Sequence, residues 1–349
     1  MMTNYKQHII NENTSIKKAL IQLDKLAKDA ILFIVDNNDK LIGSLTDGDV
    51  RRGLIKGISL QEEVLSVIQQ NPKFIRKGKS ELKEIIEYRN QNLNILPVLD
   101  DEDHIISVVN FGIVRSYLPL DAVIMAGGKG TRLMPLTETT PKPLLNVGDK
   151  PIMEHNLERL ALYGIDNFWI SVRYLGEQIE AYFGDGRQTN KFIDYVWEDT
   201  ALGTIGAVSK IKNFRHDYVL ITNSDILTNL DYESFFVDFI DQDADLSVVT
   251  IPYQVNIPYA VLETNDRHII DFKEKPTYTY YSNGGIYLIK KKWLDLIPKN
   301  FFFNATDLME KLIENKCKVI SYPLTGYWLD IGQHKDFEKA QKDIHKVKF

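Results

Sequence analysis

The chain has 349 residues, of which 44% are hydrophobic, and its formal charge at pH 7 is −6. This length and composition allow a sizeable core and are sufficient for two domains. The net negative charge argues against a surface that binds nucleic acid or anionic membranes. No apolar run approaches the length of a membrane span, and the first residues lack the apolar segment of a signal peptide. We therefore expect a globular, cytoplasmic protein.

An internal repeat marks the first part of the chain. The segment Leu41–Leu54 aligns without gaps on Ile105–Leu118, at an offset of 64 residues. Each copy follows an apolar strand and an acidic turn. Both copies resemble a CBS motif. The resemblance implies that residues 1–118 form one compact module, with motifs at about 8–60 and 61–118.

The CBS resemblance also implies a ligand and an assembly. Such pairs hold adenosine or guanosine nucleotides, with a threonine for phosphate and an aspartate for ribose hydroxyls. The first copy has Thr46 and Asp49, whereas the second has Asn110 and Ile113 at the matching positions. At most one half-site is therefore intact for a regulatory nucleotide. A module that only packs or dimerises is the alternative, and because CBS modules commonly pair we expect a homo-oligomer.

A glycine-rich loop follows the boundary at Pro119. The apolar run at 121–126 predicts a buried parallel strand, and the glycines that follow allow the backbone to turn tightly and direct amide groups at an anion. Arg132 and Lys142 add full positive charge, which suits a triphosphate whose leaving diphosphate becomes more negative. The spacing matches neither a Walker A loop nor a dinucleotide-binding loop. The candidate nucleotide-binding loop residues are Ala126, Gly127, Gly128, Lys129, Gly130 and Thr131.

Strands and helices alternate along residues 121–349. Apolar runs predict strands at 167–172, 192–197 and 218–222, and a helix between Ile152 and Tyr163. This alternation predicts a Rossmann-like, mainly parallel α/β sheet, in which ligands bind past the carboxyl ends of strands. We expect the segment 333–349 to form a closing amphipathic helix.

Two aspartates are candidate metal ligands. Asp225 follows the strand predicted at 218–222, and Asp330 lies in the segment Gly326–Gly332. Mg²⁺ typically takes one or two protein carboxylates, and phosphate oxygens and water complete its octahedron. Either aspartate alone could instead be a turn or cap residue.

The string from Gly127 to Pro143 resembles the signature of the sugar-1-phosphate nucleotidylyltransferases, with every fixed position present. The resemblance covers 121–349 and implies a GT-A-like nucleotidyltransferase domain. It assigns Mg²⁺ to Asp225 and Asp330. Among family members, the fused CBS pair most resembles mannose-1-phosphate guanylyltransferase-like proteins.

The resemblance extends to the sugar site. Lys275, in Phe272–Pro276, matches a lysine that holds the sugar phosphate. Two dianionic reactants repel each other, so a cation between them favours in-line attack. Asp307 aligns with an acidic position near the sugar, although a helix N-terminal role is an equal alternative. The candidate sugar-binding residues are Glu274, Asn283, Gly284 and Asp307.

The segment Glu198–Ala207 resembles the part of the family that lies against base and sugar. Gly203 would let backbone amides approach the base or the sugar. The Glu198 carboxylate could accept from the N–H donors of a guanine edge, which favours GTP. Pairing between Glu198 and Arg173 stays open as an alternative.

Together these residues predict transfer of a nucleoside monophosphate from an NTP, with GTP preferred, to a hexose 1-phosphate. Glucosamine 1-phosphate and mannose 1-phosphate are the expected acceptors, and the nucleotide sugar would serve cell-surface glycan or nonulosonate biosynthesis. Arg132, Lys142 and Lys275 are the predicted catalytic cations. A non-catalytic protein that senses nucleotides or nucleotide sugars is the alternative. The presence of every charged candidate favours the enzyme.

Overall fold

The computed structural model describes residues 5–189 and 191–347. The chain divides into two compact units. Unit 1 comprises Met1–Pro119 with the short segments Ala161–Asp166 and Gly186–Lys191, and unit 2 comprises Leu120–Leu160, Asn167–Asp185 and Phe192–Phe349. The assignment of a tandem CBS pair to residues 1–118 stays a prediction. The prediction that the chain does not begin with a signal peptide falls partly on residues 1–4, which lie outside the described residues.

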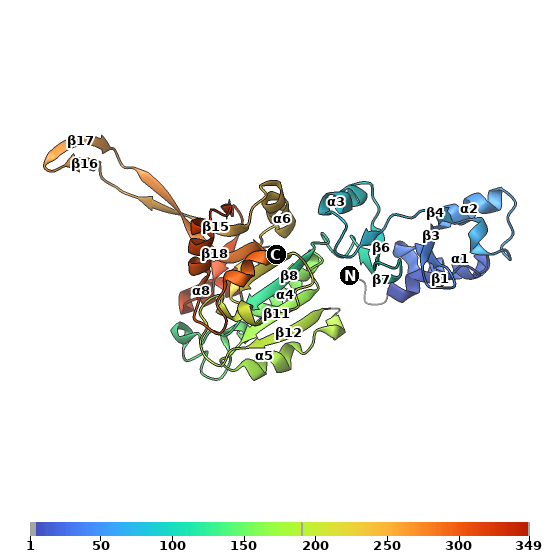
Figure 1. Ribbon diagram of the computed structural model, residues 1–349, viewed down its shortest axis with the longest axis horizontal. Coiled ribbons are helices and arrows are strands. Elements are labelled where there is room, and N and C mark those ends of the chain that lie inside the picture. The colour runs from blue at the N-terminus through green and yellow to red at the C-terminus, as the bar shows by residue number, and fades with distance from the viewer. Residues whose placement is uncertain (1–4, 190, 348–349) are drawn as a thin grey trace. The chain divides into compact units, whose positions relative to one another are not determined.

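Unit 1 contains two small sheets with helices beside them (Figure 1). The four-stranded sheet consists of β1 (Ile9–Asn11), β2 (Leu32–Val35), β3 (Leu41–Leu45) and β4 (Gln69–Gln70). The three-stranded sheet consists of β5 (Ile75–Arg76), β6 (Ile95–Leu99) and β7 (Ile105–Asn110). The α-helices are α1 (Ile16–Leu26), α2 (Asp47–Ile55) and α3 (Leu82–Asn90). Buried side chains of α1, such as Ile16 and Leu23, pack with Leu32 and Leu45 of the first sheet.

The two copies of the repeat differ at their ends. In the first copy β3 leads into α2, whereas in the second copy residues 111–119, all of them described, form no helix between β7 and β8. A capping box between Thr46 and Asp49 begins α2. The second copy has Ile113 in place of Asp49, so no carboxylate can complete such a box. Instead, the side chain of Asn110 accepts a hydrogen bond from the Gly112 amide at 2.8 Å, and the chain turns.

Unit 2 is built on a seven-stranded sheet in the order β12-β11-β8-β13-β18-β15-β19. Only β18 runs antiparallel to its neighbours, which confirms the mainly parallel α/β fold. The strands expected after residue 120 are all present. The bounds are β8 (Leu120–Met125), β11 (Asn167–Val172), β12 (Phe192–Trp197), β13 (Tyr218–Asn223), β15 (Leu246–Asn256), β18 (Thr277–Lys290) and β19 (Val319–Pro323).

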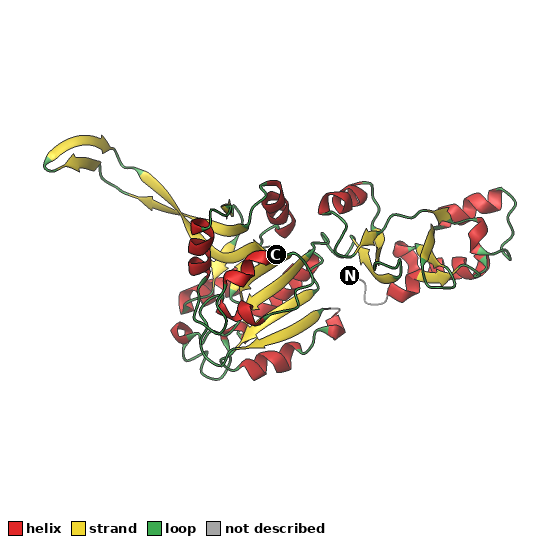
Figure 2. Ribbon diagram, viewed as in Figure 1, coloured by secondary structure: helices red, strands yellow, loops and turns green. Residues whose placement is uncertain are grey.

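Helices flank the sheet of unit 2 (Figure 2). Leu308 and Leu312 of α7 are buried in one core with Val123 and Ile221 of the central strands. The helices are α4 (Ile152–Leu162), α5 (Gly176–Phe183), α6 (Tyr232–Asp241), α7 (Ala305–Glu314) and α8 (His334–Asp343). The closing helix is therefore shorter than the expected 333–349, of which residues 348–349 lie outside the described residues. No helix within the described ranges is both long and apolar enough to cross a bilayer.

Three two-stranded pairings complete unit 2: β9 (Asn146–Val147) with β10 (Lys150–Pro151), β14 (Ile226–Thr228) with β20 (Trp328–Asp330), and β16 (Val261–Asn265) with β17 (His268–Lys273). Beyond Thr250, where pairing with β19 ends, β15 and β18 continue as a two-stranded ladder from Ile251↔Ser282 to Asn256↔Thr277. The hairpin β16–β17 lies beyond this ladder (Figure 1). We call residues 251–282 the arm.

Candidate active site

The glycine loop directly follows β8 and is fixed by close packing. Gly130 has a φ of 63°, in the left-handed region that glycine adopts without strain. A Cβ atom at Gly127 would lie 2.5 Å from Oε1 of Glu198, so only glycine fits there without a shift. The Thr137 hydroxyl donates to the Gly130 carbonyl at 2.9 Å and holds the end of the loop. By contrast, a Cβ at Gly128 would meet open space.

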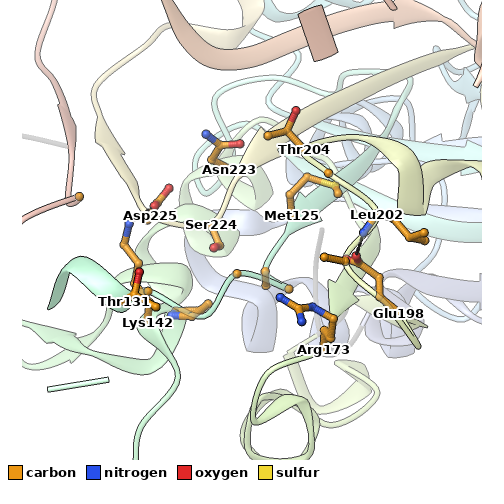
Figure 3. A pocket seen from close by; sticks show the side chains of 18 of the residues that line it. Met125, Thr131, Lys142, Arg173, Glu198, Leu202, Thr204, Asn223, Ser224 and Asp225 are labelled. Atoms are coloured by element: carbon orange, nitrogen blue, oxygen red, sulfur yellow. Dashed lines mark hydrogen bonds and ion pairs between the residues drawn. The ribbon is translucent and has the colours of Figure 1, made fainter. Parts of the chain in front are cut away.

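This loop borders a cavity of about 390 Å³, which we call the donor pocket. Its volume is within the range of small-molecule sites. Figure 3 shows Arg173, Glu198 and Leu202 on one side of the pocket and Thr131, Lys142 and Asp225 on the other. The lining includes Ala126, Gly127, Gly128, Gly130, Thr131, Arg132, Lys142, Arg173, Glu198, Gly203 and Asp225. The structure thus gathers most of the predicted nucleotide-binding residues around one cavity.

The candidate metal ligands are brought together by a short ladder. Asp225 directly precedes β14, which pairs with β20 so that Ile226 lies opposite Asp330. The Ile331 amide also donates to the Asp225 carbonyl at 3.1 Å. Lys142 lies between the carboxylates: its Nζ is hydrogen-bonded to Oδ2 of Asp225 and is 3.8 Å from Oδ1 of Asp330. Residues far apart in sequence therefore form one charged cluster.

Two oxygen atoms of the carboxylate cluster accept no hydrogen bond. The Oδ1 atoms of Asp225 and Asp330 are buried, and neither has a hydrogen-bond partner. Burial, and next the neighbouring Asp225 carboxylate, raise the pKa of Asp330, while Lys142 and Arg132 act in the opposite direction. Buried carboxylate oxygens normally have partners, so these two atoms fit a cation. No group of three or more metal-ligating side chains occurs in the described part of the chain, so a metal here would need further oxygens from substrate or water.

Two arginine side chains at the donor pocket are available to bind a ligand. Arg132 lies beside the carboxylates, since a Cβ at Gly332 would be 3.7 Å from its Nη1 and 3.6 Å from both Asp330 oxygens. Arg173 follows the last residue of β11 and is half-buried. Within residues 5–189 and 191–347, neither side chain forms a hydrogen bond or an ion pair. Both are therefore free to bind an anion.

Glu198 anchors the loop that follows β12. Its Oε1 accepts a hydrogen bond from the Ser171 hydroxyl, and its Oε2 accepts from the Leu202 amide at 3.0 Å. These protein donors, rather than Arg173, satisfy the buried carboxylate. Glu198 does line the donor pocket, but its action on a guanine edge stays a prediction.

Gly203 holds the same loop against residues 303–305. Its φ is 80°, and a Cβ there would lie 2.6 Å from the Phe303 carbonyl oxygen. The Thr204 hydroxyl accepts from the Ala305 amide at 2.9 Å. The glycine is therefore required for backbone packing, whatever its contact with a base.

A second cavity, of about 310 Å³, shares Thr204 and Asn223 with the donor pocket, and we call it the acceptor pocket. The side chain of Asn283 is 2.7 Å from the Tyr287 hydroxyl and accepts from the Gly285 amide at 2.9 Å. Its full lining is Thr204, Asn223, Ile226, Asn283, Gly284, Gly285, Tyr287, Asn304, Ala305, Thr306, Trp328 and Asp330. No lysine, arginine or histidine belongs to this lining.

Several predicted site residues lie elsewhere. Glu274 and Lys275 are exposed on the arm and line neither pocket. Asp307 completes a capping box at the start of α7, where its Oδ2 accepts from the Asn304 amide at 2.8 Å, which is the alternative that the sequence left open. Lys129 is exposed, with its Nζ 5.6 Å from the centre of the Tyr174 ring.

In unit 1, Thr46 and Asp49 serve the start of α2. Oδ2 of Asp49 accepts from the Thr46 amide at 2.8 Å and from the Thr46 hydroxyl at 2.6 Å. Its Oδ1 accepts from Arg52 at 2.6 Å. The pair therefore has a helix-capping role, and binding of a regulatory nucleotide stays a prediction.

From sequence alone, Arg173 is expected only as a partner for Glu198. Its position in the sequence could have indicated a role at the ligand site. Arg173 is the first residue past the carboxyl end of β11, and β11 pairs in parallel with β8. Side chains at that edge of a parallel sheet face the ligand. Asn223 and Thr204, which connect the two pockets, were likewise not selected.

A glycine loop, free cations and a carboxylate pair at the carboxyl ends of parallel strands define an α/β nucleotide-binding protein. Comparison with known protein families agrees. The nucleotidyl transferase family matches residues 121–347, and the CBS domain matches residues 1–56. The chain belongs to the nucleotidyl transferase family.

Among curated relatives, the chain is similar to a UTP–glucose-1-phosphate uridylyltransferase of Synechocystis (31% identity over 64% of this chain and 63% of the relative). It is also similar to a mannose-1-phosphate guanylyltransferase of Mycobacterium tuberculosis (30% identity, 64% of each chain). The chain thus spans less than two thirds of the length of these two relatives. A crystal structure of HddC from Yersinia pseudotuberculosis complexed with GMP-PN superposes with a TM-score of 0.50, at 26% identity over 64% of this chain and 99% of that chain.

Proposed function

We propose that the protein transfers a nucleoside monophosphate from an NTP to a hexose 1-phosphate and releases diphosphate. The observation that carries this proposal is the donor pocket, where a glycine loop, three cations and the Asp225 carboxylate adjoin a second pocket that is lined by Asp330. The triphosphate would bind along the loop and Arg132, and the sugar would bind in the acceptor pocket. The shared border at Thr204 and Asn223 would place the two phosphates next to each other.

The reaction needs one displacement at phosphorus. A phosphate oxygen of the sugar 1-phosphate attacks the α-phosphorus in line, a new P–O bond forms, and the bond to the β-phosphate oxygen breaks. No covalent enzyme intermediate is required. Arg132 would neutralise the leaving diphosphate and Lys142 the transferring phosphate, because fixed cations stabilise charge that develops in the transition state.

Asp225 and Asp330 would hold Mg²⁺, which family members generally use. Their Oδ1 atoms, which accept no hydrogen bond, suit a hard cation that takes one or two protein carboxylates. When bound, Mg²⁺ supplies positive charge to the triphosphate oxygens. Lys142, hydrogen-bonded to Asp225, would then turn toward the phosphates.

We propose GTP as the nucleotide, and glucosamine 1-phosphate or mannose 1-phosphate as the acceptor, in the cytoplasm. The guanylyltransferase relative and the structure titled as a GMP-PN complex support GTP. The uridylyltransferase relative supports a different base, so the nucleotide must be tested directly. Arg173 adds a free donor pair of the kind that binds phosphate or a guanine edge.

The test is a matrix of four NTPs against hexose 1-phosphates, with diphosphate release measured with Mg²⁺ and with EDTA. We expect release only when NTP, sugar phosphate and Mg²⁺ are all present, and most rapidly with GTP. A folded protein that converts no pair of NTP and sugar phosphate, and no nucleotide sugar with diphosphate in the reverse reaction, would refute the proposal. Turnover with another NTP would refute only the choice of GTP.

A further inference from the structure

The arm is a two-stranded ribbon with an uncovered apolar face. Leu262 lies opposite Phe272 in the β16–β17 ladder, so these two side chains share one face. Ile270, which falls at the register shift of the ladder and is left unpaired, is a third apolar side chain close by. They are 51%, 63% and 66% exposed in the order Leu262, Phe272, Ile270. The other face carries charge, including an ion pair of 3.4 Å between Lys273 and Glu263.

Such a ribbon is not expected to persist in water without a partner. An isolated two-stranded hairpin is at best marginally stable, and no third strand or helix covers the arm within the described residues. Tyr253 and Tyr280, opposite each other near its base, are about as exposed as the apolar residues at its tip. The arm therefore carries an interaction surface along its whole length.

The acceptor pocket has no cation of its own: the nearest one, Lys142 at its border, is already paired with Asp225 and Asp330. Its lining contains the Asp330 carboxylate and no cationic side chain, although a bound sugar phosphate would bring further negative charge. The candidate cation for this phosphate, Lys275, lies on the arm two residues before Thr277. Within one chain, the acceptor pocket and Lys275 are therefore far apart.

Lys275 cannot reach the pocket of its own chain while the ladder is intact. Asn283 lines the acceptor pocket, and the strand runs from Asn283 to Thr277 in continuous pairing with β15. Six strand residues span roughly 20 Å, which is far longer than a lysine side chain. Folding the arm back would break the pairs from Ile251↔Ser282 to Asn256↔Thr277.

We propose that the arm lies on a second copy of this chain and that Lys275 completes the acceptor pocket of that copy. The inference rests on the proposed function for the role of the pocket. A two-fold dimer makes the exchange reciprocal, because each arm covers the other unit 2 and each pocket receives one lysine. A partner of another sequence would leave the acceptor pocket without its cation, which is why a second copy is the occupant that fits.

Mixed dimers test this directly. The pocket variant Asp225→Asn and the arm variant Lys275→Ala are each expected to lose most diphosphate release. Dimers that contain one chain of each, isolated with two different tags, have one intact site formed by the arm of the first chain and the pocket of the second. We expect about half of the wild-type rate per mixed dimer. No recovery would overturn the proposal, since an arm acting on its own chain leaves both sites defective.

A cross-linking experiment separates this inference from the proposed function. A photo-reactive benzoylphenylalanine in place of Phe272 should give a covalent dimer, with the cross-link on unit 2 of the second chain. The matched control replaces Asp271, which faces the other side of the ribbon and should cross-link much less. Cross-links within one chain, or none at all, would overturn the arm exchange. If the wild-type protein consumed no substrate while the inter-chain cross-link formed, the proposed function would fail and the arm exchange would stand.

Discussion

Replacing Lys142 by methionine removes a charge and keeps most of the volume of the side chain. The Lys142 and Asp225 side chains are only 13% and 17% exposed, whereas the Asp330 side chain is 42% exposed. The substitution therefore leaves the nearly buried Asp225 carboxylate without its cation, beside a partly exposed carboxylate. Breaking a buried ion pair typically costs 3–5 kcal/mol, and an exposed pair about 0–1 kcal/mol. We expect Lys142→Met to lower the free energy of unfolding by about 2–4 kcal/mol, since these groups are mostly but not fully buried.

Tryptophan fluorescence during urea denaturation measures this change. All four tryptophans, Trp169, Trp197, Trp293 and Trp328, belong to unit 2, so the signal reports the unit that contains the cluster. The matched control is Lys150→Met. Lys150 pairs with Glu158 at side-chain exposures of 28% and 48%, so its loss should cost less than about 1 kcal/mol.

Mg²⁺ gives the second half of the test. If Asp225 and Asp330 form a cation site, Mg²⁺ should restore part of the stability of Lys142→Met, by about 1.4 kcal/mol at ten times its Kd. The control variant should gain no more than the wild type. Equal losses in the two variants, or no differential response to Mg²⁺, would refute the electrostatic account of the cluster.

Further predictions concern single side chains around the donor pocket. Arg132→Ala should reduce turnover by about 100-fold to 1,000-fold without loss of stability, because Arg132 forms no ion pair with any residue that the structure describes; near-native turnover would contradict its role. Arg173→Ala should raise KM for the NTP by about tenfold or more, since a hydrogen bond to a charged group contributes about 1.5–3 kcal/mol, and an unchanged KM would exclude contact with the nucleotide. Gly203→Ala should destabilise unit 2 by at least about 1–2 kcal/mol through its left-handed φ alone, whereas Gly128→Ala, with open space around it, should keep its urea midpoint.

Much of the donor pocket could be predicted from sequence because position and chemistry agree there. The glycine loop and Asp225 each follow a parallel strand, and such strands end at one edge of the sheet. Asp330 was harder, because β20 is outside the main sheet and its pairing with β14 depends on the tertiary fold. Its role as a metal ligand was indicated by the resemblance to a known family.

Other features could not be separated by sequence. Asp49 and Asp307 each lie three residues after the N-cap residue of a helix. This spacing is compatible with a capping box as well as with a ligand site. A strand covered by a third element has the same sequence pattern as one that is bare, so the exposure of the arm could not be predicted from sequence. Lys275 therefore appeared next to the sugar site in sequence, although the ladder separates them within one chain.

The three-residue pairing of β14 with β20 has a consequence for how the protein can vary. Because hydrogen bonds between these strands set the separation of Asp225 and Asp330, the length of chain joining them does not. Insertions or deletions within the arm, residues 251–282, can therefore change its reach without moving the carboxylates. A shift of one residue in the pairing of β14 with β20 would instead turn Asp330 to the opposite side of its strand and abolish the cation site.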